Sequence, residues 1–277
     1  QEQQAMLRYL AGGTCLMESL RSALDDPAAQ PCGRCSVCTG QLPPPGAEPD
    51  PDVLAAALGQ LRSVDAVLEP RRMWPAGPAA GERGNPAAPA RRGTPSEPGR
   101  GGTPPMPARR GKIPEPSRAE PGRALAFAQD PGWGDAVQRA LAVDGPVDQE
   151  IFDGCVRLLA RWGWPAGRPV SVVPMPSRRR GLLVADLAER LAAVGRLEVA
   201  PVLGQVDDET FQDDAQTGRG SAEGALRRLS VIAPVPAGPV LLVDDVSRSG
   251  FTLTVAAALL REAGAGPVYP LVLHKRP

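Results

Sequence analysis

The chain has 277 residues, including 33 prolines and 31 glycines, so it is longer than one average domain but cannot be packed core throughout. Basic and acidic residues balance at 31 each, so the overall charge gives no reason to expect a nucleic-acid or membrane partner. No apolar run approaches the roughly 18 residues that span a bilayer, and the N-terminus has no signal pattern. These features predict a soluble, cytoplasmic protein with two folded regions and a linker.

The first predicted domain covers residues 1–42 and is helical. Apolar residues recur at spacings of three and four along residues 1–24, with a break at a Gly-Gly pair and a stop at an Asp-Asp-Pro sequence. A cysteine-rich segment completes this domain. Residues 43–69 form a predicted connector that begins with prolines and continues as a short helix over about 52–68.

Residues 70–123 have the composition of a largely disordered linker, with 13 prolines and 9 glycines among 54 residues. They carry 11 basic and 4 acidic side chains. By contrast, residues 1–69 carry 4 basic and 9 acidic side chains, and residues 124–277 carry 16 basic and 18 acidic side chains. A basic segment can bind a nucleic-acid backbone without sequence preference. The alternative is compositional bias, because 29 of the 31 basic residues of the chain are arginines.

The second predicted domain covers residues 124–277, where helical and apolar strand patterns alternate. Helices are expected at 133–141, 149–164, 182–194, 222–229 and 252–263, and strands at 170–173, 197–203, 240–246 and 268–273. Several of the strands are continuous apolar runs, as in strands that are buried on both faces. The pattern predicts an α/β fold with a mainly parallel sheet between two layers of helices.

Four of the five cysteines are spaced as metal ligands. Cys15, Cys32, Cys35 and Cys38 form a C-x16-C-x2-C-x2-C array, in which the first cysteine lies on a helix and the others in a tight turn. Four thiolates complete a tetrahedral zinc site and leave no position for a reacting water, so we expect the zinc to be structural. The alternative is unligated or disulfide-linked cysteines. Cys155 stands alone on an apolar helix and is expected in the core.

The cysteine-rich segment resembles the zinc-binding subdomain of RecQ-family DNA helicases. The similarity covers about 40 residues and rests on the sequences GTCLM at 13–17, ALDDP at 23–27 and PCGRCSVCTG at 31–40. It implies a parent protein that unwinds DNA in repair and recombination, with DNA as its partner. The chain lacks a G-x-x-x-x-G-K-[ST] phosphate loop and begins at Gln1. We therefore expect a fragment whose ATP- and magnesium-dependent motor lies upstream.

A second pattern combines a buried strand, two carboxylates, a turn of hydroxyl and glycine residues, and a helix. It reads VLLVDDVSRSGFT over residues 240–252. Gly250 permits close approach of the backbone, and the first N–H groups of the helix favour a phosphate, beside the hydroxyls of Ser249 and Thr252. Asp244 and Asp245 can accept hydrogen bonds from ribose hydroxyls or bind magnesium. Ligands of open parallel sheets bind at this end of the strands.

This segment resembles the phosphoribosyl-pyrophosphate motif of type I phosphoribosyltransferases. The resemblance implies a phosphoribosyl or phosphate site formed by residues that follow the strand: Asp244, Asp245, Ser249, Gly250, Phe251 and Thr252. The region from residue 170 onward looks most like the ComF branch of this family. In that branch the loop after the first strand contacts pyrophosphate, and the corresponding loop here contains Arg178, Arg179 and Arg180. That loop is a candidate for pyrophosphate or DNA phosphate contacts; the alternative is a solvated charge run.

Two residues depart from this family's pattern. Arg248 stands where purine-using members have an acid, which argues against acid–base chemistry on a purine, and Phe251 replaces a small residue. His274, the single histidine, is expected to be structural or solvated. We therefore expect a domain that binds a phosphoribosyl ligand, with magnesium, or a nucleic-acid end.

The expected fold is multi-domain, with a small helical zinc-binding subdomain and an α/β type I phosphoribosyltransferase-like domain. The leading interpretation is the C-terminal part of a RecQ-like DNA helicase. One alternative is a ComF-like DNA-processing protein, although its zinc site usually has two separated C-x2-C pairs. Another alternative is a true phosphoribosyltransferase of nucleotide salvage.

Overall fold

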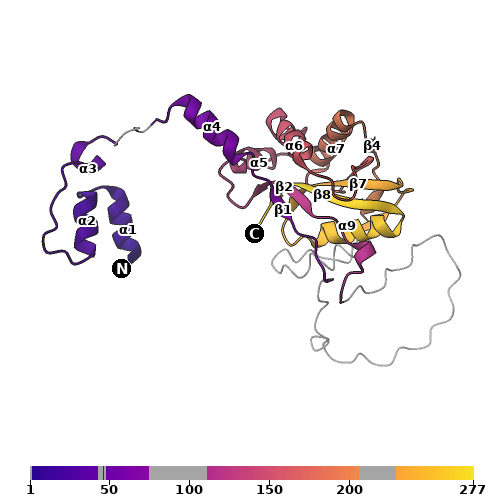
Figure 1. Cartoon of the computed structure of the whole chain (residues 1–277), viewed down its shortest axis with the longest axis horizontal. Helices are drawn as coiled ribbons and strands as arrows, with labels where there is room; N and C mark the ends of the chain where they lie inside the picture. The colour runs from indigo at the N-terminus through magenta and orange to yellow at the C-terminus, as the bar shows by residue number, and fades with distance from the viewer. Residues whose placement is uncertain (1, 43–45, 47, 75–110, 206–228) are drawn as a thin grey trace, which may run out of the picture. The chain divides into compact units, whose positions relative to one another are not determined.

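A computed structural model describes residues 2–42, 46, 48–74, 111–205 and 229–277 of the chain (Figure 1). The chain divides into two compact units, Gln1–Gln60 and Leu61–Pro277. The predicted boundaries differ from this division, because the second domain was expected to begin at residue 124. Segments from the predicted connector and linker contribute to the second unit.

The first unit is helical. Its elements are α1 (Glu2–Ala11), α2 (Leu16–Ala23), α3 (Ser36–Thr39) and most of α4 (Pro51–Leu61). The break between α1 and α2 lies at Gly12, whose φ of +66° favours glycine. After α2, the Asp26 carboxylate accepts hydrogen bonds from the Arg21 side chain at 2.6 Å and from the Ala28 N–H at 2.9 Å. The helix predicted over 52–68 is shorter than expected, because the chain turns after α4 and enters a strand.

The second unit is built on a six-stranded sheet with the order β1-β2-β8-β7-β3-β4. The strands are β1 (Ala66–Leu68), β2 (Gly122–Phe127), β8 (Ala265–Lys275), β7 (Gly238–Ser247), β3 (Ser171–Pro174) and β4 (Glu198–Val199). All neighbouring pairs are parallel except β1 and β2. A separate antiparallel pair consists of β5 (Leu203–Gln205) and β6 (Leu229–Val231).

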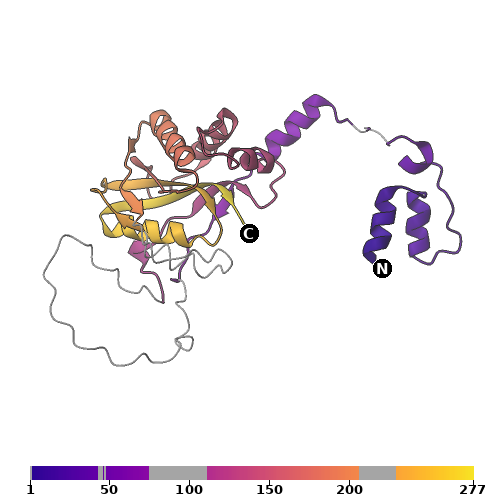
Figure 2. The same ribbon diagram turned by 180° about the vertical axis from the view of Figure 1, so that it is seen from behind.

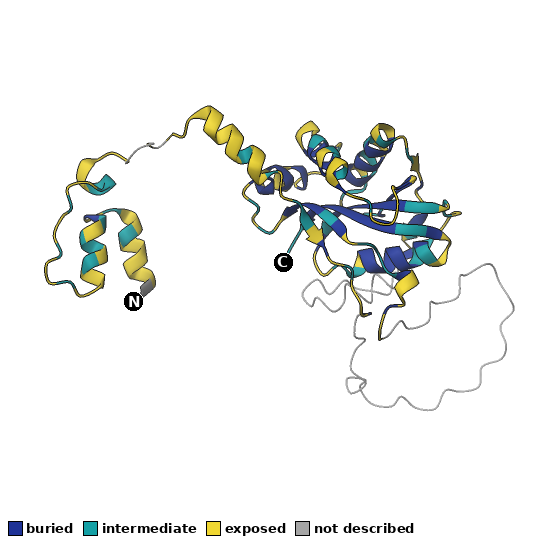
Figure 3. Ribbon diagram, in the orientation of Figure 1, coloured by how far each residue is buried: buried dark blue, intermediate teal, exposed yellow. Residues whose placement is uncertain are grey.

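Helices cover both faces of this sheet (Figures 1 and 2). One layer contains α5 (Gly134–Ala140), α6 (Gln149–Arg161) and α7 (Gly181–Gly195); the other contains α9 (Phe251–Glu262) and the short helix η1 (Glu115–Ser117). Successive residues of β7 enter opposite cores, since Leu241 packs with the first layer and Leu242 with the second. Figure 3 shows the resulting buried strands and the buried inner faces of the helices. The predicted α/β fold with a mainly parallel sheet is confirmed.

Three strands, β1, β2 and β6, and one loop pairing were not predicted. The pattern over 122–127 was not identified as a strand, yet β2 is the neighbour of β8. Residues on either side of 75–110 also come together: the Trp74 N–H donates to the Gly111 carbonyl and the Ile113 N–H to the Arg72 carbonyl, each at 2.9 Å. Trp74 and Ile113 are buried in the core beneath α9. The ends of the predicted linker therefore belong to the second unit.

Two other predictions concern ranges that the structure describes only in part. The helix expected over 222–229 lies outside the described residues, apart from Leu229 at the start of β6. Most of the predicted linker, residues 75–110, also lies outside them. Within the described ranges, no helix has both the length and the apolar character needed to cross a membrane.

Candidate functional site

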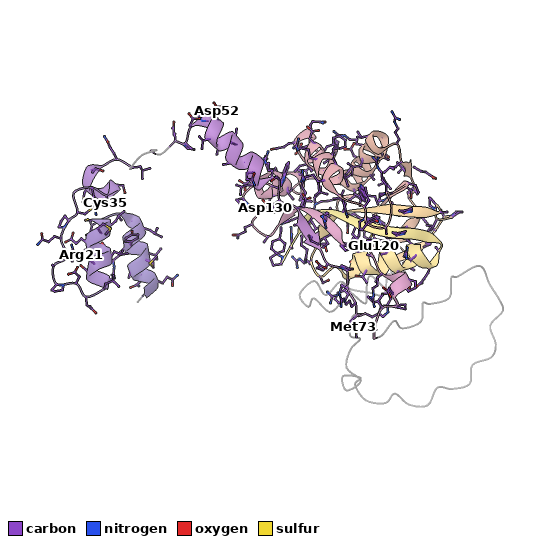
Figure 4. The ribbon with its side chains drawn as sticks, viewed as in Figure 1. Arg21, Cys35, Asp52, Met73, Glu120 and Asp130 are labelled. Carbon is purple, nitrogen blue, oxygen red and sulfur yellow. The ribbon has the colours of Figure 1, made fainter. Side chains whose placement is uncertain are left out.

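The first candidate site is the cysteine cluster of the first unit. Cys15 immediately precedes α2, Cys35 immediately precedes α3, and Cys38 lies within α3, while Cys32 lies in the loop between the two helices. The ligand atoms of all four residues lie within 4.8 Å of one another. Figure 4 labels Cys35 beside the helices of this unit. A left-handed Gly33, with φ of +70°, lets the loop turn sharply between Cys32 and Cys35.

Backbone N–H groups direct the sulfurs toward one point. The Cys32 N–H donates to the Cys15 Sγ at 3.2 Å, and the Cys35 N–H donates to the Cys32 Sγ at 3.3 Å. Hydrogen bonds of this kind favour the thiolate: the backbone of Cys32 lowers the pKa of Cys15, and the backbone of Cys38 lowers the pKa of Cys35 to about 6. A backbone hydrogen bond from Gly33 lowers the pKa of Cys38, but hydrogen bonds with Cys15 and Cys35 outweigh it and raise that pKa to about 11.

The sulfur positions fit a metal ion. Zinc–sulfur bonds of about 2.3 Å in a tetrahedron place the sulfurs about 3.8 Å apart. The Cys15 and Cys35 sulfurs are 3.8 Å apart. The four clustered cysteines can therefore bind a metal ion, and the donor set is compatible with structural zinc. Cys155 takes no part in the cluster, since it is buried in the core of the second unit, where burial raises its pKa to about 12.

The second candidate site lies at the carboxyl ends of β7 and β3. Asp244 and Asp245 are near the end of β7, and each is only 8% exposed. The backbone holds both carboxylates: Asp244 Oδ1 accepts from the Asp245 N–H at 2.9 Å, and Asp245 Oδ1 accepts from the Val246 N–H at 2.6 Å. Because β3 runs parallel to β7, with Pro174 opposite Val243, the loop after β3 reaches the same edge of the sheet.

Only one of the two carboxylates has a cation as its partner. Arg180, the residue before α7, donates from Nη1 to Asp245 Oδ2 at 2.7 Å and from Nε to the Leu141 carbonyl at 2.8 Å. Asp244 has no such partner among the described residues. Burial, followed by the charge of Asp245, raises the pKa of Asp244 well above its usual value. A cation that binds here would offset this penalty, which suits a site for magnesium or another cation.

The loop between β7 and α9 leaves room for a ligand. Gly250 has φ of +73°, and apart from its two chain neighbours no atom of the described residues lies within 4 Å of the position where a Cβ would be. Ser249 and Thr252 are exposed, whereas Phe251 is partly buried. The Thr254 hydroxyl donates to the Gly250 carbonyl at 2.8 Å and fixes the first turn of α9. The 12-residue α9 thus presents its N-terminus at the carboxyl end of the sheet, where an anion is favoured.

Two basic residues donate hydrogen bonds to this loop. Neither was identified as a site residue from the sequence. Arg71 donates from Nη1 to the Ser249 carbonyl at 2.7 Å, and its guanidinium lies 3.7 Å from the centre of the Phe251 ring. Lys275, at the end of β8, donates to the Arg248 carbonyl. Burial and the charge of Arg71 lower the pKa of Lys275. No motif signalled Arg71, because it lies at the start of residues 70–123, which have the composition of a largely disordered linker.

The three arginines of the loop after β3 are not equivalent. Arg178 and Arg179 are exposed, whereas Arg180 is partly buried and bonded to Asp245. The structure therefore brings one of the three predicted phosphate contacts, Arg180, to the acidic pair. His274 was expected to be structural or solvated; it is 6% exposed, and its Nε2 lies 2.9 Å from the Ala128 carbonyl.

Comparison with known proteins adds no family. No model of a protein family matches the chain. No curated protein matches it either.

Proposed function

We propose that the carboxyl edge of the sheet binds a phosphoribosyl group, with phosphoribosyl pyrophosphate and magnesium as the ligand. The observation that carries this proposal is the combination of two buried carboxylates on β7 with an open glycine loop at the N-terminus of α9. The resemblance of residues 240–252 to the type I phosphoribosyltransferase motif supports the same ligand. The order of strands and helices in this unit is compatible with such a fold.

Each part of the site would have a separate task. Asp244 and Asp245 would bind the ribose hydroxyls, directly or through magnesium, which prefers carboxylate oxygens. The backbone N–H groups at the start of α9, with the exposed hydroxyls of Ser249 and Thr252, would bind the phosphate. Arg180 would hold Asp245 in place from the opposite loop.

Titration of the full chain with phosphoribosyl pyrophosphate and magnesium tests this proposal by calorimetry. We expect measurable binding below 1 mM, and a loss of at least about tenfold in affinity for Asp244→Asn, because the neutral amide binds a cation more weakly than a carboxylate does. Arg168→Gln is a matched control, since this exposed arginine precedes the amino end of β3. The proposal is wrong if millimolar ligand produces no heat.

We also propose that the first unit is a structural zinc unit of a RecQ-like DNA helicase. The support is the clustering of the four sulfurs together with the resemblance of residues 13–40 to the RecQ zinc subdomain. In this proposal zinc holds the unit that engages duplex DNA, and an ATP-dependent motor supplies the unwinding. The coding sequence upstream of Gln1 tests it directly. A phosphate loop followed by a second motor lobe would support the proposal, and a start codon a few residues upstream would refute it.

DNA binding by the chain itself would depend on the basic segment at residues 75–110, which falls within the sequence of the second unit. Contacts with phosphates release counterions, so affinity falls as salt rises. Deleting residues 75–110, which lie outside the described residues, removes six arginines and two glutamates. We expect this deletion to flatten the salt dependence of binding to duplex DNA in a fluorescence anisotropy assay. An unchanged slope would show that the segment does not contact DNA.

A further inference from the structure

A pocket of about 380 Å³ lies in the second unit beside the proposed phosphoribosyl site. Its lining residues are Gln138 of α5, Leu141 directly after α5, Arg180 directly before α7, and His274 and Arg276 near the end of the chain. None of these residues belongs to the Asp244–Thr252 segment. The pocket is nevertheless joined to that segment, because Arg180 lines the pocket and also donates to Asp245. Its volume suits a small molecule.

His274 contributes a buried polar atom that has no partner among the residues that the structure describes. The side chain is 6% exposed, and Nε2 lies 2.9 Å from the Ala128 carbonyl, which can only accept. Nε2 must therefore carry a proton, and Nδ1 of a singly protonated ring is an acceptor. Within the described residues Nδ1 has no hydrogen-bond partner. A buried acceptor in this state calls for a donor from outside the protein.

The charged groups of the pocket are cationic. Arg276 is partly buried and is anchored through its backbone, whose N–H donates to the Ser247 carbonyl at 2.8 Å. None of the described residues forms an ion pair with its guanidinium. Arg180 is the second cation, and the lining residues include no carboxylate. Since Asp245 neutralises Arg180, Arg276 supplies the uncompensated charge.

We propose that this pocket binds the acidic group of a small molecule, a carboxylate or a phosphate, that also carries an N–H or O–H group. The oxyanion would pair with Arg276, whose fork of donors matches such a group. The N–H or O–H would donate to His274 Nδ1. The identity of this small molecule rests on the proposed function. If the neighbouring site binds phosphoribosyl pyrophosphate, the pocket binds the acceptor molecule that receives the phosphoribosyl group. An acidic acceptor agrees with Arg248, where purine-using enzymes of the resembled family have an acid.

Titration of the full chain with 3-hydroxybenzoate, benzoate and inorganic phosphate, followed by NMR, tests the pocket without any phosphoribosyl ligand. We expect 3-hydroxybenzoate to bind more tightly than benzoate by at least threefold, because only the former offers a donor to His274. Arg276→Gln should weaken its binding at least fivefold. Arg168→Gln, at the other edge of the sheet, is the matched control and should bind as the unmodified chain does. Tighter binding of phosphate than of both carboxylates would assign the pocket to a phosphate group.

The outcomes separate this proposal from the proposed function. Asp244→Asn should weaken binding of phosphoribosyl pyrophosphate at least about tenfold and leave 3-hydroxybenzoate binding within twofold. Arg276→Gln should weaken 3-hydroxybenzoate binding at least fivefold and leave binding of phosphoribosyl pyrophosphate within twofold. The pocket proposal is overturned if none of the three anions binds at 10 mM, or if Arg276→Gln binds them as well as the unmodified chain while its circular dichroism spectrum is unchanged. Absence of binding by phosphoribosyl pyrophosphate alone would overturn only the acceptor role.

Discussion

The two units of this chain bury very different amounts of apolar surface. Among the described residues of the first unit, Cys15 alone is buried, and large apolar side chains such as Leu10 and Leu24 are about three-quarters exposed (75% and 76%). The second unit has two extensive cores, one on each face of its sheet. Burial of apolar surface is the main favourable term in folding, at about 25 cal/mol per Å². The first unit lacks this term and must therefore depend on another source of stability.

The cysteine cluster is the obvious source. Structural zinc contributes on the order of 10 kcal/mol to small units of this kind. The second unit needs no such contribution, because apolar residues of β7 and β8 are buried on both faces of the sheet. The difference indicates that a metal held by the four cysteines and core packing would be separate supports in one chain, and that each could be removed alone.

Removing the metal is expected to have the largest effect, and only on the first unit. Chelation, or the double substitution Cys32→Ser and Cys35→Ser, should unfold residues 2–42, because no core replaces the lost bonds. Hydrogen exchange measured by mass spectrometry should show full exchange of these peptides while those of β7 and β8 stay protected. Cys155→Ala is the matched control, since this cysteine lies in the other unit. Retained protection of residues 2–42 without metal would contradict the inference that the first unit depends on a bound metal for its stability.

Crowding the core should have the next largest effect, confined to the second unit. Gly154 of α6 packs against the buried Trp133, and a Cβ there would lie 2.6 Å from the ring atom Cη2. Because ring and backbone are both held, Gly154→Ala should destabilise the unit by about 1–3 kcal/mol in denaturant unfolding. Gly145→Ala is the control, since no atom lies within 4 Å of its Cβ position. Equal stability of the two variants would mean that the core is looser than described.

Substitutions of the acidic pair, Asp244 and Asp245, are expected to change the free energy of unfolding by less, and the change depends on pH. The pKa of Asp244 is raised in the folded chain, so ionisation opposes folding once the pH exceeds the unfolded value of about 3.9. Stability is therefore lost as the pH rises from that value toward the folded pKa. Asp244→Asn should raise the free energy of unfolding at pH 7 by about 1 kcal/mol and make no difference near pH 3.

Asp245→Asn is the contrasting variant for the same measurement. It leaves Arg180, whose side chain is 21% exposed, without its carboxylate, so stability at pH 7 should fall rather than rise. Thermal unfolding across pH 3 to 8 distinguishes the two directions. If both variants lose stability at pH 7, Asp244 is held by an interaction other than the backbone hydrogen bond described above. The expected gain for Asp244→Asn fits a residue retained for binding at the expense of stability.

The sequence predicted the main sheet well because its central strands are continuous apolar runs. β7 and β8 are buried on both faces, and such runs are hard to mistake when helices flank them. β2 was missed because its apolar run is short and lies next to proline-rich sequence, so its pairing with β8 is set by contacts distant in the chain. β1 was missed because the helix predicted over 52–68 included its residues, and its pairing with β2 is also set by contacts distant in the chain.

Parts of the candidate site were predictable to different degrees. Asp244, Asp245 and Gly250 were found because strand, acids, glycine and helix are consecutive in the chain. The distinction between Arg180 and its neighbours Arg178 and Arg179 could not be predicted, since it depends on which side chain reaches Asp245 across the sheet. The proposed role of His274 was also hidden, because a lone histidine carries no spacing information. Its neighbours in the pocket come from two distant segments and from the residues directly after β8.

The smallest effect is expected from removing the contacts between Arg71 and the loop that joins β7 to α9. Arg71 bonds the Ser249 carbonyl and stacks on Phe251, but it is exposed, where a cation–π contact contributes about 0.5–1 kcal/mol. Arg71→Gln should therefore leave the melting temperature within about 2 °C and still speed hydrogen exchange at residues 249–252 severalfold, since only this loop loses a contact. Arg72→Gln, the exposed neighbour, is the control. Unchanged exchange in the loop would mean that the Gly250 turn and the Thr254 hydrogen bond suffice to hold it, and that Arg71 adds nothing to the site.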